Sequence, residues 1–345
     1  MVLKIGICGF GKMGQIRSQS IRRRTDAELV AAYDTQFQAL PECTIASSVE
    51  AVIADPEIDA VFVCLPNFLN KQTTIDALRA GKHVFCEKPP AFCEQDVDEI
   101  MVAEQASGKV LMYGFNHRQH DGVLKMSEII RSKEYGRPLW ARGRYGKSVD
   151  ESYLTGWRAK KSLAGGGILL DQGIHMLDLL LLVAGQPFDE VNAMVSNMYW
   201  KTDGIEDNVF AMMRVAESGF TASLHSTMTQ WRHLFSLEVF LERGYCVLNG
   251  LKTSSGTYGE EVLTIARNRS QAPAATWDDE ERIRFSEDFS WDRELDIFLR
   301  AIKTGQPVAS GSSQQAKTVM AMIDRIYQEK SHSAAELFDA LQPGG

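Results

Sequence analysis

The first 116 residues alternate between two hydrophobic patterns. Short runs of mostly apolar residues, typical of strands buried on both faces, are separated by stretches with an apolar residue every three or four positions, typical of amphipathic helices. The predicted strands cover residues 2–8, 28–33, 59–66, 82–89 and 109–116, and the predicted helices cover 12–24, 48–55, 71–81 and 93–108. Buried strands joined by helices form a parallel sheet covered on both faces, so this part of the chain is predicted to be a doubly wound α/β domain.

A different pattern follows residue 118. After one amphipathic helix over 121–136, longer segments alternate polar and apolar positions, which predicts a mainly antiparallel sheet with one buried face. Its strands are predicted over 190–200, 207–216, 219–230, 234–244, 245–250 and 261–268, followed by a loop or irregular edge over 267–288 and helices over 291–305 and 312–330. Because 345 residues exceed the size at which one core usually stops growing, we expect two domains, 1–118 and 119–345.

Composition and charge narrow the class of protein. A hydrophobic content of 44% and a charged content of 24% are typical of soluble globular proteins. The net charge of -8 argues against a nucleic-acid partner, which would need clustered basic residues. The longest apolar segment, 176–184, is far shorter than a membrane span, and the N-terminal segment is unlike a signal peptide, so we expect a cytoplasmic protein without a membrane partner. The six cysteines lack the spacing of a metal site, so no metal is expected.

A glycine-rich motif lies where this fold would place a phosphate-binding loop. Gly9, Gly11 and Gly14 form G-x-G-x-x-G between the first predicted strand and the first helix, and Asp34 ends the second strand. Glycines let the backbone approach a pyrophosphate, which the helix N-terminus then stabilises. A carboxylate at Asp34 can accept hydrogen bonds from ribose hydroxyls but would repel the 2′-phosphate of NADP. The sequence therefore predicts NAD as the cofactor, with further contacts from the loop residues Phe10, Lys12 and Met13.

Lys88 lies in the sequence Glu87-Lys88-Pro89-Pro90, directly after a predicted strand. In a doubly wound sheet the ligand binds at the carboxyl ends of the strands, so Lys88 is expected where a nicotinamide ring would lie. Pro89 fixes its own φ and biases Lys88 toward an extended conformation, which restricts the direction of the ammonium group. The alternative is a solvated surface lysine, the more frequent situation at the end of a strand.

Polar residues interrupt the apolar segment GGGILLDQGIHMLD at 165–178. Asp171, His175 and Asp178 are spaced i, i+4 and i+7, so a continuous helix would put them on one face, toward a cleft. A histidine there is suited to proton transfer near neutral pH. The alternative is structural: an aspartate that caps the helix and a satisfied core histidine. We interpret Asp178 as structural, in a helix cap or in a bond between the domains.

Together these motifs resemble the Gfo/Idh/MocA family of oxidoreductases. The matching elements are GFGKMG at 9–14, Asp34, CLPN at 64–67, GKHVFCEKP at 81–89, GWR at 156–158 and GGGILLDQGIHMLDLL at 165–180. The resemblance implies an N-terminal Rossmann domain, a C-terminal α/β domain with a large open, mainly antiparallel sheet, and a last helix that packs back on the first domain. It also implies hydride transfer to or from a sugar or polyol carbon, with Lys88, Asp171 and His175 as catalytic residues; which of Lys88 and His175 carries the proton stays open at this point.

The resemblance extends to further residues around the expected cleft. It implies cofactor contacts from Leu65, Pro66, Asn67, Glu87 and Asn116, and substrate contacts from Arg118, Trp157, Arg158 and Gln172. This chain has Asn70 where family members often carry a histidine.

The substrate is interpreted first as a nucleotide sugar or a related precursor of surface polysaccharides. The stretch around residues 145–178 looks like family members of that kind, and Arg158, Lys160 and Lys161 offer cations for a phosphate, although these side chains could equally form a solvated loop. The alternatives are a free polyol or cyclitol dehydrogenase, an enzyme that cleaves glycosides with NAD, and an NAD-binding regulator without catalysis.

The predicted antiparallel sheet has one face for helices and one face left over. Aromatic and methionine residues on it could belong to the core or to an interface, and they include Met198, Trp200, Phe210 and Met212. We expect a homodimer or homotetramer formed through this sheet.

Overall fold

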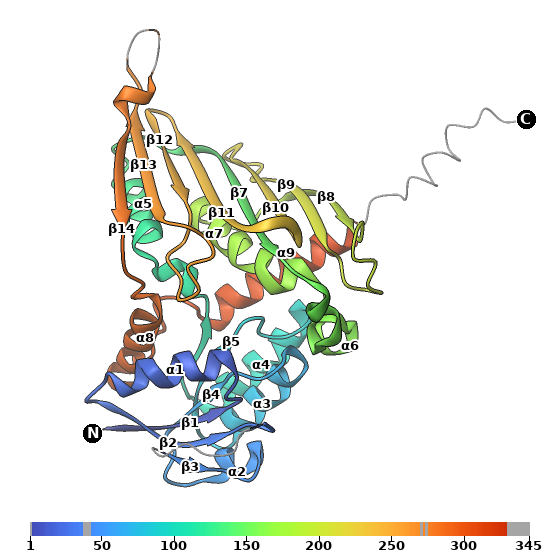
Figure 1. The fold of residues 1–345 in the computed structure, drawn as a ribbon. Coiled ribbons are helices and arrows are strands. Elements are labelled where there is room, and N and C mark those ends of the chain that lie inside the picture. The colour runs from blue at the N-terminus through green and yellow to red at the C-terminus, as the bar shows by residue number, and fades with distance from the viewer. Residues whose placement is uncertain (1, 37–42, 270–271, 273–274, 330–345) are drawn as a thin grey trace, which may run out of the picture.

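The computed structural model describes residues 2–36, 43–269, 272 and 275–329. Figure 1 shows two sheets: a smaller one near the N-terminus at the bottom and a larger one above it. This arrangement of a parallel Rossmann-like sheet and a mostly antiparallel sheet confirms the predicted α/β fold class.

The smaller sheet has six parallel strands in the order β3-β2-β1-β4-β5-β6. Its strands are β1 (Leu3–Cys8), β2 (Ala27–Tyr33), β3 (Thr44–Ile45), β4 (Ala60–Val63), β5 (His83–Glu87) and β6 (Leu111–Gly114). The connecting helices are α1 (Lys12–Arg22), α2 (Val49–Ala54), α3 (Asn67–Arg79) and α4 (Glu94–Ser107). The strand order reverses between β1 and β4, which is where a doubly wound sheet opens a crevice for a ligand.

The larger sheet has eight strands in the order β14-β13-β12-β11-β7-β10-β9-β8. The strands are β7 (Pro138–Ser148), β8 (Glu190–Ser196), β9 (Asn208–Arg214), β10 (Thr221–Thr227), β11 (Thr229–Leu241), β12 (Gly244–Asn249), β13 (Glu261–Arg267) and β14 (Glu281–Phe285). Neighbouring strands are antiparallel except β7 and β10, which run parallel.

Two strands of this sheet differ from the prediction. The sequence pattern did not predict β7, although it lies near the centre of the sheet, because glycines and arginines alternate with its apolar residues. Gly143 is required there: a Cβ at this position would lie 2.5 Å from Met176 of the covering helix. The second difference is β14, a regular edge strand within 267–288, where a loop or irregular edge was expected. Residues 270, 271, 273 and 274 of that range lie outside the described residues.

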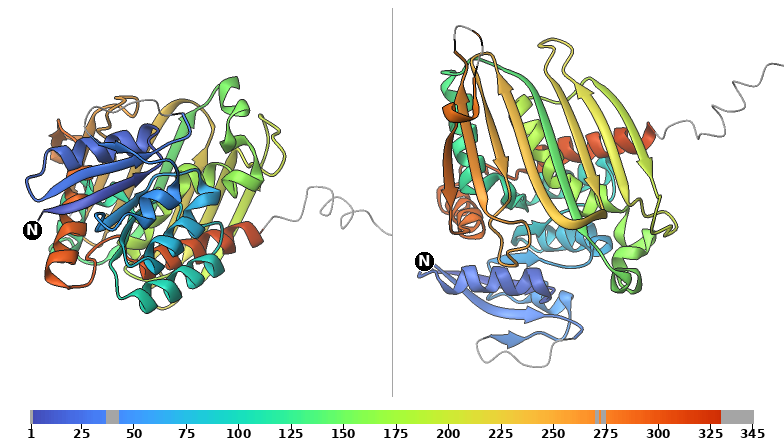
Figure 2. Two further views of the ribbon diagram at one scale, coloured as in Figure 1. Left: turned by 90° about the horizontal axis from the view of Figure 1, so that it is seen from below. Right: turned by 45° about the horizontal axis from the view of Figure 1, so that its top comes forward.

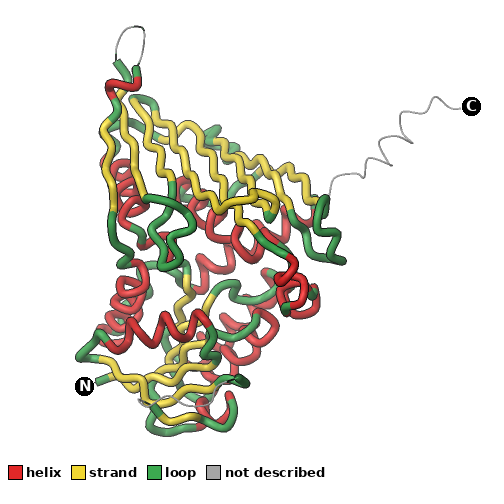
Figure 3. The backbone as a smooth tube through the Cα atoms, viewed as in Figure 1, coloured by secondary structure: helices red, strands yellow, loops and turns green. Residues whose placement is uncertain are grey.

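Helices cover one face of the larger sheet and leave the other open, as the right view of Figure 2 and the tube in Figure 3 show. The helices of this half are α5 (Asp121–Ser132), α6 (Lys161–Ala164), α7 (Ile174–Ala184), α8 (Ser290–Thr304) and α9 (Ser313–Gln328). Short helical segments add η1 (Asn116–Gln119), η2 (Glu151–Thr155), η3 (Trp157–Ala159), η4 (Leu169–Gly173) and η5 (Trp277–Asp279). Among the described residues, the stretch Lys161–Ala184 is long and apolar enough to cross a membrane by composition alone, and 72% of its most apolar window is buried inside the molecule.

Both C-terminal helices contact the first sheet or its helices. Phe298 of α8 packs edge-on against Phe62 and Phe85, with ring centres 5.6 and 5.8 Å away, and completes the core on that side of the sheet. From α9, the carboxylate of Asp324 accepts a 2.8 Å hydrogen bond from the main-chain N–H of Glu94 at the start of α4. The last helix, α9, therefore packs against the first half of the chain as expected. Helix α8 does so as well, which the sequence pattern did not predict.

Candidate active site

The glycine loop between β1 and α1 has the shape of a phosphate cradle. Gly9 has φ +91°, and a Cβ there would lie 2.4 Å from the carbonyl oxygen of Cys64. A Cβ at Gly14 would lie 2.2 Å from the carbonyl oxygen of Gly9, so helix α1 also needs a glycine to approach the loop. At Gly11 a Cβ would meet no described atom within 4 Å, and no described side chain caps this end of α1. The first N–H groups of the helix therefore face open space, which fits a pyrophosphate.

Asp34 lies at the carboxyl end of β2 and holds the same loop. Its Oδ2 accepts a 2.7 Å hydrogen bond from the main-chain N–H of Phe10, and its Oδ1 accepts one of 2.9 Å from Gln36 N–H. Each carboxylate oxygen has a second lone pair, so both remain able to accept from a ribose hydroxyl. The residues present therefore fit the adenosine half of NAD.

Hydrogen bonds to the backbone on both sides of Lys88, and one from its ammonium group, fix the direction of its side chain. The side-chain amide of Asn70 donates 2.8 and 3.4 Å hydrogen bonds to the main-chain oxygens of Pro89 and Glu87, the two neighbours of Lys88. The Lys88 ammonium group donates a 2.6 Å hydrogen bond to the main-chain oxygen of Asp171. Asn70 thus fixes the backbone from which the lysine projects. Burial lowers the pKa of Lys88, partly offset by the charge of Asp171.

Asp171 is surrounded by cations. Lys147 binds its Oδ2, while Arg158 Nε and Lys88 Nζ lie 3.7 and 3.9 Å from its Oδ1. Burial by itself would raise the pKa of this carboxyl group, but Lys147, Lys88 and Arg158 outweigh burial and hold the pKa well below its usual range. Asp171 is therefore ionised at neutral pH.

His175 lies in a buried aromatic group. Its ring stacks on His117 with centres 3.8 Å apart, and His117 Nε2 lies 2.9 Å from the hydroxyl of Tyr145. His117 Nδ1 lies 3.0 Å from Asn116 Oδ1, while the Asn116 amide donates to Ser290. These contacts assign the Nδ1–H tautomer to His117, so Tyr145 donates to its Nε2. Burial, Lys88 and His120 lower the pKa of His175 well below its usual range, so its imidazole is neutral at neutral pH.

The helix around these residues is not a continuous α-helix. Leu169–Gly173 form a π-helical turn, in which Ile174 N–H donates to the Leu169 carbonyl, and the α-helix begins only at Ile174. A π turn changes the angular step between residues, so the continuous helix assumed for the spacing i, i+4 and i+7 is interrupted between Asp171 and His175. Asp178 accepts hydrogen bonds of 2.7 and 2.5 Å from Arg118 and is fully buried. This buried ion pair supports the interpretation of Asp178 as a structural residue, and Arg118 lies at the predicted boundary between the domains.

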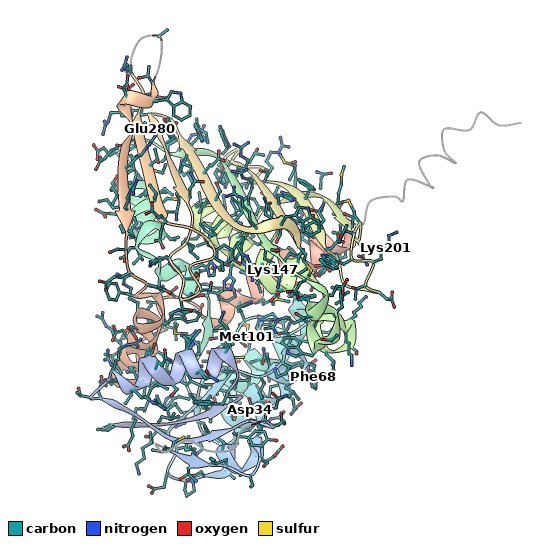
Figure 4. All side chains as sticks on the ribbon, viewed as in Figure 1. Asp34, Phe68, Met101, Lys147, Lys201 and Glu280 are labelled. Atoms are coloured by element: carbon teal, nitrogen blue, oxygen red, sulfur yellow. The ribbon has the colours of Figure 1, made fainter. Side chains whose placement is uncertain are left out.

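Several of these groups line one cavity of about 490 Å³ between the two sheets. Figure 4 shows Lys147 at the end of the larger sheet that faces the Rossmann domain. Among the predicted site residues, those that line the cavity are Lys12, Met13, Glu87, Lys88, Asn116, Gln172 and His175. Asp171 adjoins it through Lys88 and Lys147, so the three proposed catalytic residues meet at one place.

Some of the predicted residues make structural contacts. Glu87 accepts a 2.7 Å hydrogen bond from buried Arg17, and the Asn67 amide donates to Ala164 O at 2.9 Å. Arg118 is taken up by Asp178 and lies outside this cavity, so its predicted substrate contact conflicts with its burial in an ion pair. Leu65 and Pro66 precede α3, and Arg158 lies over the ring of Trp157, also outside the cavity lining.

The sequence pattern did not predict several residues of the site. Lys147 and Tyr145 project from β7, the strand that was not predicted, and Tyr258 donates a 3.1 Å hydrogen bond to Gln172. His117 and Trp291 also line the cavity. The two-residue spacing of Tyr145 and Lys147 was the available signal, because alternate strand residues share a face. Among the residues that the structure describes, no group of three or more His, Cys, Asp or Glu side chains could hold a metal ion.

Comparison with known proteins identifies both halves of the chain. Residues 3–115 match the model of the oxidoreductase family with an NAD-binding Rossmann fold, and residues 123–247 match the GFO/IDH/MocA C-terminal domain. The 1,5-anhydro-D-fructose reductase of Ensifer adhaerens is 34% identical over 251 residues, which cover 72% of this chain and 73% of that protein. The myo-inositol 2-dehydrogenase of Thermotoga maritima is 25% identical over 320 residues, covering 89% and 90% of the two chains.

A solved structure agrees in fold. Levoglucosan dehydrogenase in complex with NADH and levoglucosan superposes with a TM-score of 0.81 at 23% identity, covering 96% of this chain and 98% of that one. The glycine cradle and Asp34 are then the features of this chain that fit the cofactor of the matched Rossmann model. The chain therefore belongs to the Gfo/Idh/MocA family of oxidoreductases, with an NAD-binding Rossmann domain and the family's C-terminal domain.

Proposed function

We propose that this protein is an NAD-dependent dehydrogenase that transfers hydride between the cofactor and a hydroxyl-bearing carbon of a free sugar or polyol. The observation that carries the proposal is that Lys88 and His175, from the two halves of the chain, line one cavity next to the glycine loop, with Asp171 in contact with Lys88 beside it. The bound nicotinamide would accept or donate the hydride; the protein's own residues bind the substrate, exclude water and move the proton.

His175 is the group best suited to take the hydroxyl proton during oxidation. Its neutral, buried imidazole can accept a proton, and stacking on His117 holds the ring in place. Lys88 is held by the main-chain oxygen of Asp171 and directs its charge into the same cavity, where it would stabilise negative charge on the reacting oxygen. Reduction runs through the same groups in reverse, with His175 returning the proton.

The size and lining of the cavity favour a small substrate. About 490 Å³ must hold the nicotinamide ring as well as the reacting sugar, which leaves little room for a nucleotide. The loop between β12 and β13 adds hydroxyl-bearing residues to the lining: Thr253, Ser254, Ser255 and Thr257. Of the cations predicted to meet a phosphate, Arg158 is directed at Asp171 and Lys161 lines a different cavity. The names of the relatives, which act on an anhydrosugar and on inositol, support the same substrate class.

Steady-state assays test the proposal. The purified protein is incubated with NAD or NADP and a panel of free sugars, anhydrosugars, inositols and nucleotide sugars, and nicotinamide absorbance is followed. We expect turnover with a free sugar or polyol, preference for NAD, and a fall in kcat of about 100-fold or more for both Lys88→Ala and His175→Ala. Near-native turnover of either variant would refute its role.

The same assay separates the alternatives. Turnover of nucleotide sugars alone would favour the interpretation drawn from residues 145–178. NAD binding by calorimetry without turnover of any compound in the panel would favour a regulator. A lower Kd for NADP than for NAD would contradict the role given to Asp34.

A further inference from the structure

Three cations surround Asp171, and each of them contacts it in a different way. Lys147 binds carboxylate Oδ2 directly. Arg158 and Lys88 stay 3.7 and 3.9 Å from Oδ1, beyond ordinary hydrogen-bond distance. Lys88 instead donates to the main-chain oxygen of Asp171 at 2.6 Å. The carboxylate is thus held by Lys147, while the proposed catalytic lysine is tied to the backbone.

Lys147 is built into the cavity wall. It lies near the end of β7, two residues after Tyr145, so both side chains point to the cavity face of the strand. Its side chain is 11% exposed, and the ammonium group lies 4.8 Å from the centre of the Tyr153 ring. A lysine so enclosed has few alternative positions, and its charge acts at short range.

We propose that Lys147 is a positioning residue of the reaction: it holds the Asp171 carboxylate away from Lys88, so that the Lys88 ammonium group stays directed at the reacting oxygen. This inference rests on the proposed function for its catalytic consequence. Without Lys147, the Asp171 carboxylate would be left with Arg158 and Lys88, whose nitrogens lie 3.7 and 3.9 Å from Oδ1, and it would be free to turn to either of them. A direct ion pair would draw Lys88 off the substrate.

The change would also be visible in the titration of Lys88. The charged and titratable groups that act on it or are acted on by it are Asp171, Arg158, Glu87, Lys147, His117 and His175. Loss of Lys147 removes one like charge and brings the opposite charge of Asp171 closer. Both changes favour the charged form, so the pKa of Lys88 rises.

Three variants test the inference: Lys147→Met, which keeps the apolar stem, Lys147→Arg, which keeps the charge, and Lys125→Met, an exposed surface control. For Lys147→Met we expect kcat to fall about 10-fold or more with a small change in KM, and the high-pH limb of kcat/KM to move up by about one pH unit. Lys147→Arg should recover most of kcat, and Lys125→Met should match the wild type.

A second readout does not need activity. NMR titration of the protein labelled with 13C at lysine Cε, with Lys88→Met used for assignment, reports the pKa of Lys88 directly. A higher pKa in Lys147→Met supports the inference even if no sugar in the panel is turned over, an outcome that would count only against the proposed function. The inference is overturned if the Lys88 titration and the pH profile are both unchanged in Lys147→Met and any lower activity is accounted for by lower stability of the variant.

Discussion

At the scale of single residues, the site depends on buried groups whose charge is set by their neighbours. Asp171 is kept ionised by cations, whereas His117 and His175 are kept neutral, because burial and the nearby Lys88 and His120 lower the pKa of each ring well below its usual range. Because the rings of His117 and His175 stack 3.8 Å apart, the pair can take up only one proton readily, since two imidazolium rings at that distance would repel each other.

This arrangement predicts how stability depends on pH. In the unfolded chain His117 titrates near its ordinary pKa, about 6.5, but in the folded protein it stays neutral to much lower pH. Below about pH 6.5 the unfolded state therefore binds more protons, and the free energy of unfolding falls as pH decreases until the folded pKa is reached.

The contribution of His117 can be isolated by comparing wild type with His117→Asn in urea unfolding between pH 7 and 5. We expect wild type to lose about 1.4 kcal/mol per pH unit more than the variant over the lower part of this range. The difference between two proteins cancels opposing groups such as Glu294, whose pKa is raised to about 8 by burial despite the nearby charge of Arg17. Parallel curves would show that folding leaves the pKa of His117 unchanged.

At the scale of elements, one residue of a distant loop holds the start of the helical segment that carries Asp171 and His175. The Glu206 carboxylate accepts hydrogen bonds from Gly167 N–H at 2.7 Å, Leu169 N–H at 2.9 Å and the Tyr327 hydroxyl at 2.8 Å. Its main-chain oxygen also accepts from Ile168 N–H. The run of three glycines makes this approach possible: a Cβ at Gly167 would lie 2.1 Å from that main-chain oxygen. The start of this apolar helical segment is thus held by a residue that lies outside it, Glu206.

Removal of this anchor should be costly. Glu206→Ala would leave two buried N–H groups and one hydroxyl without their acceptor, and each buried donor left unsatisfied costs about 1–3 kcal/mol, so we expect a loss of roughly 3 kcal/mol or more in the free energy of unfolding. Glu190→Ala, which removes one partner of an exposed ion pair with Arg214, should cost less than about 1 kcal/mol. Denaturant unfolding measures both, and equal effects would contradict the anchoring role.

At the scale of the whole molecule, Figure 2 shows that helices cover one face of the larger sheet and that the other face is open. Exposed apolar side chains on it include Met194, Phe210 and Met212, at 67%, 49% and 52% exposure. Phe210 stacks on His225 with ring centres 3.9 Å apart, which presents a flat, rigid surface. Of the residues predicted for an interface, Met198 is also exposed, whereas Trp200 is half-buried. This face supports the prediction of a homo-oligomer.

Light scattering coupled to size exclusion tests that prediction at micromolar concentration. We expect a dimer or tetramer for wild type and a shift to smaller species for Phe210→Asp, because a charge in the centre of an apolar interface is costly to bury. Lys125→Met serves as the surface control. A monomeric wild type would end the prediction, and an oligomer unaffected by the aspartate would place the interface elsewhere.

The sequence by itself determined what local patterns can encode. Strand–helix alternation, the spacing of Gly9, Gly11, Gly14 and Asp34, and the position of Lys88 after a strand all reflect short-range rules of backbone geometry, so the Rossmann fold, its cofactor and one catalytic candidate followed from them. The division at residue 118 and the individual site roles stay predictions.

Tertiary structure decided what depends on contacts between distant segments. Lys147 reaches Asp171 from a strand with a weak pattern, His117 stacks on His175 from another element, and Arg118 is withdrawn from the site by Asp178. The π turn at Leu169–Gly173 interrupts the regular helix before His175, and helix periodicity contains no signal for that turn. Charge pairing and packing across the domains are long-range properties, so the partners of each buried group appear only when the chain is folded.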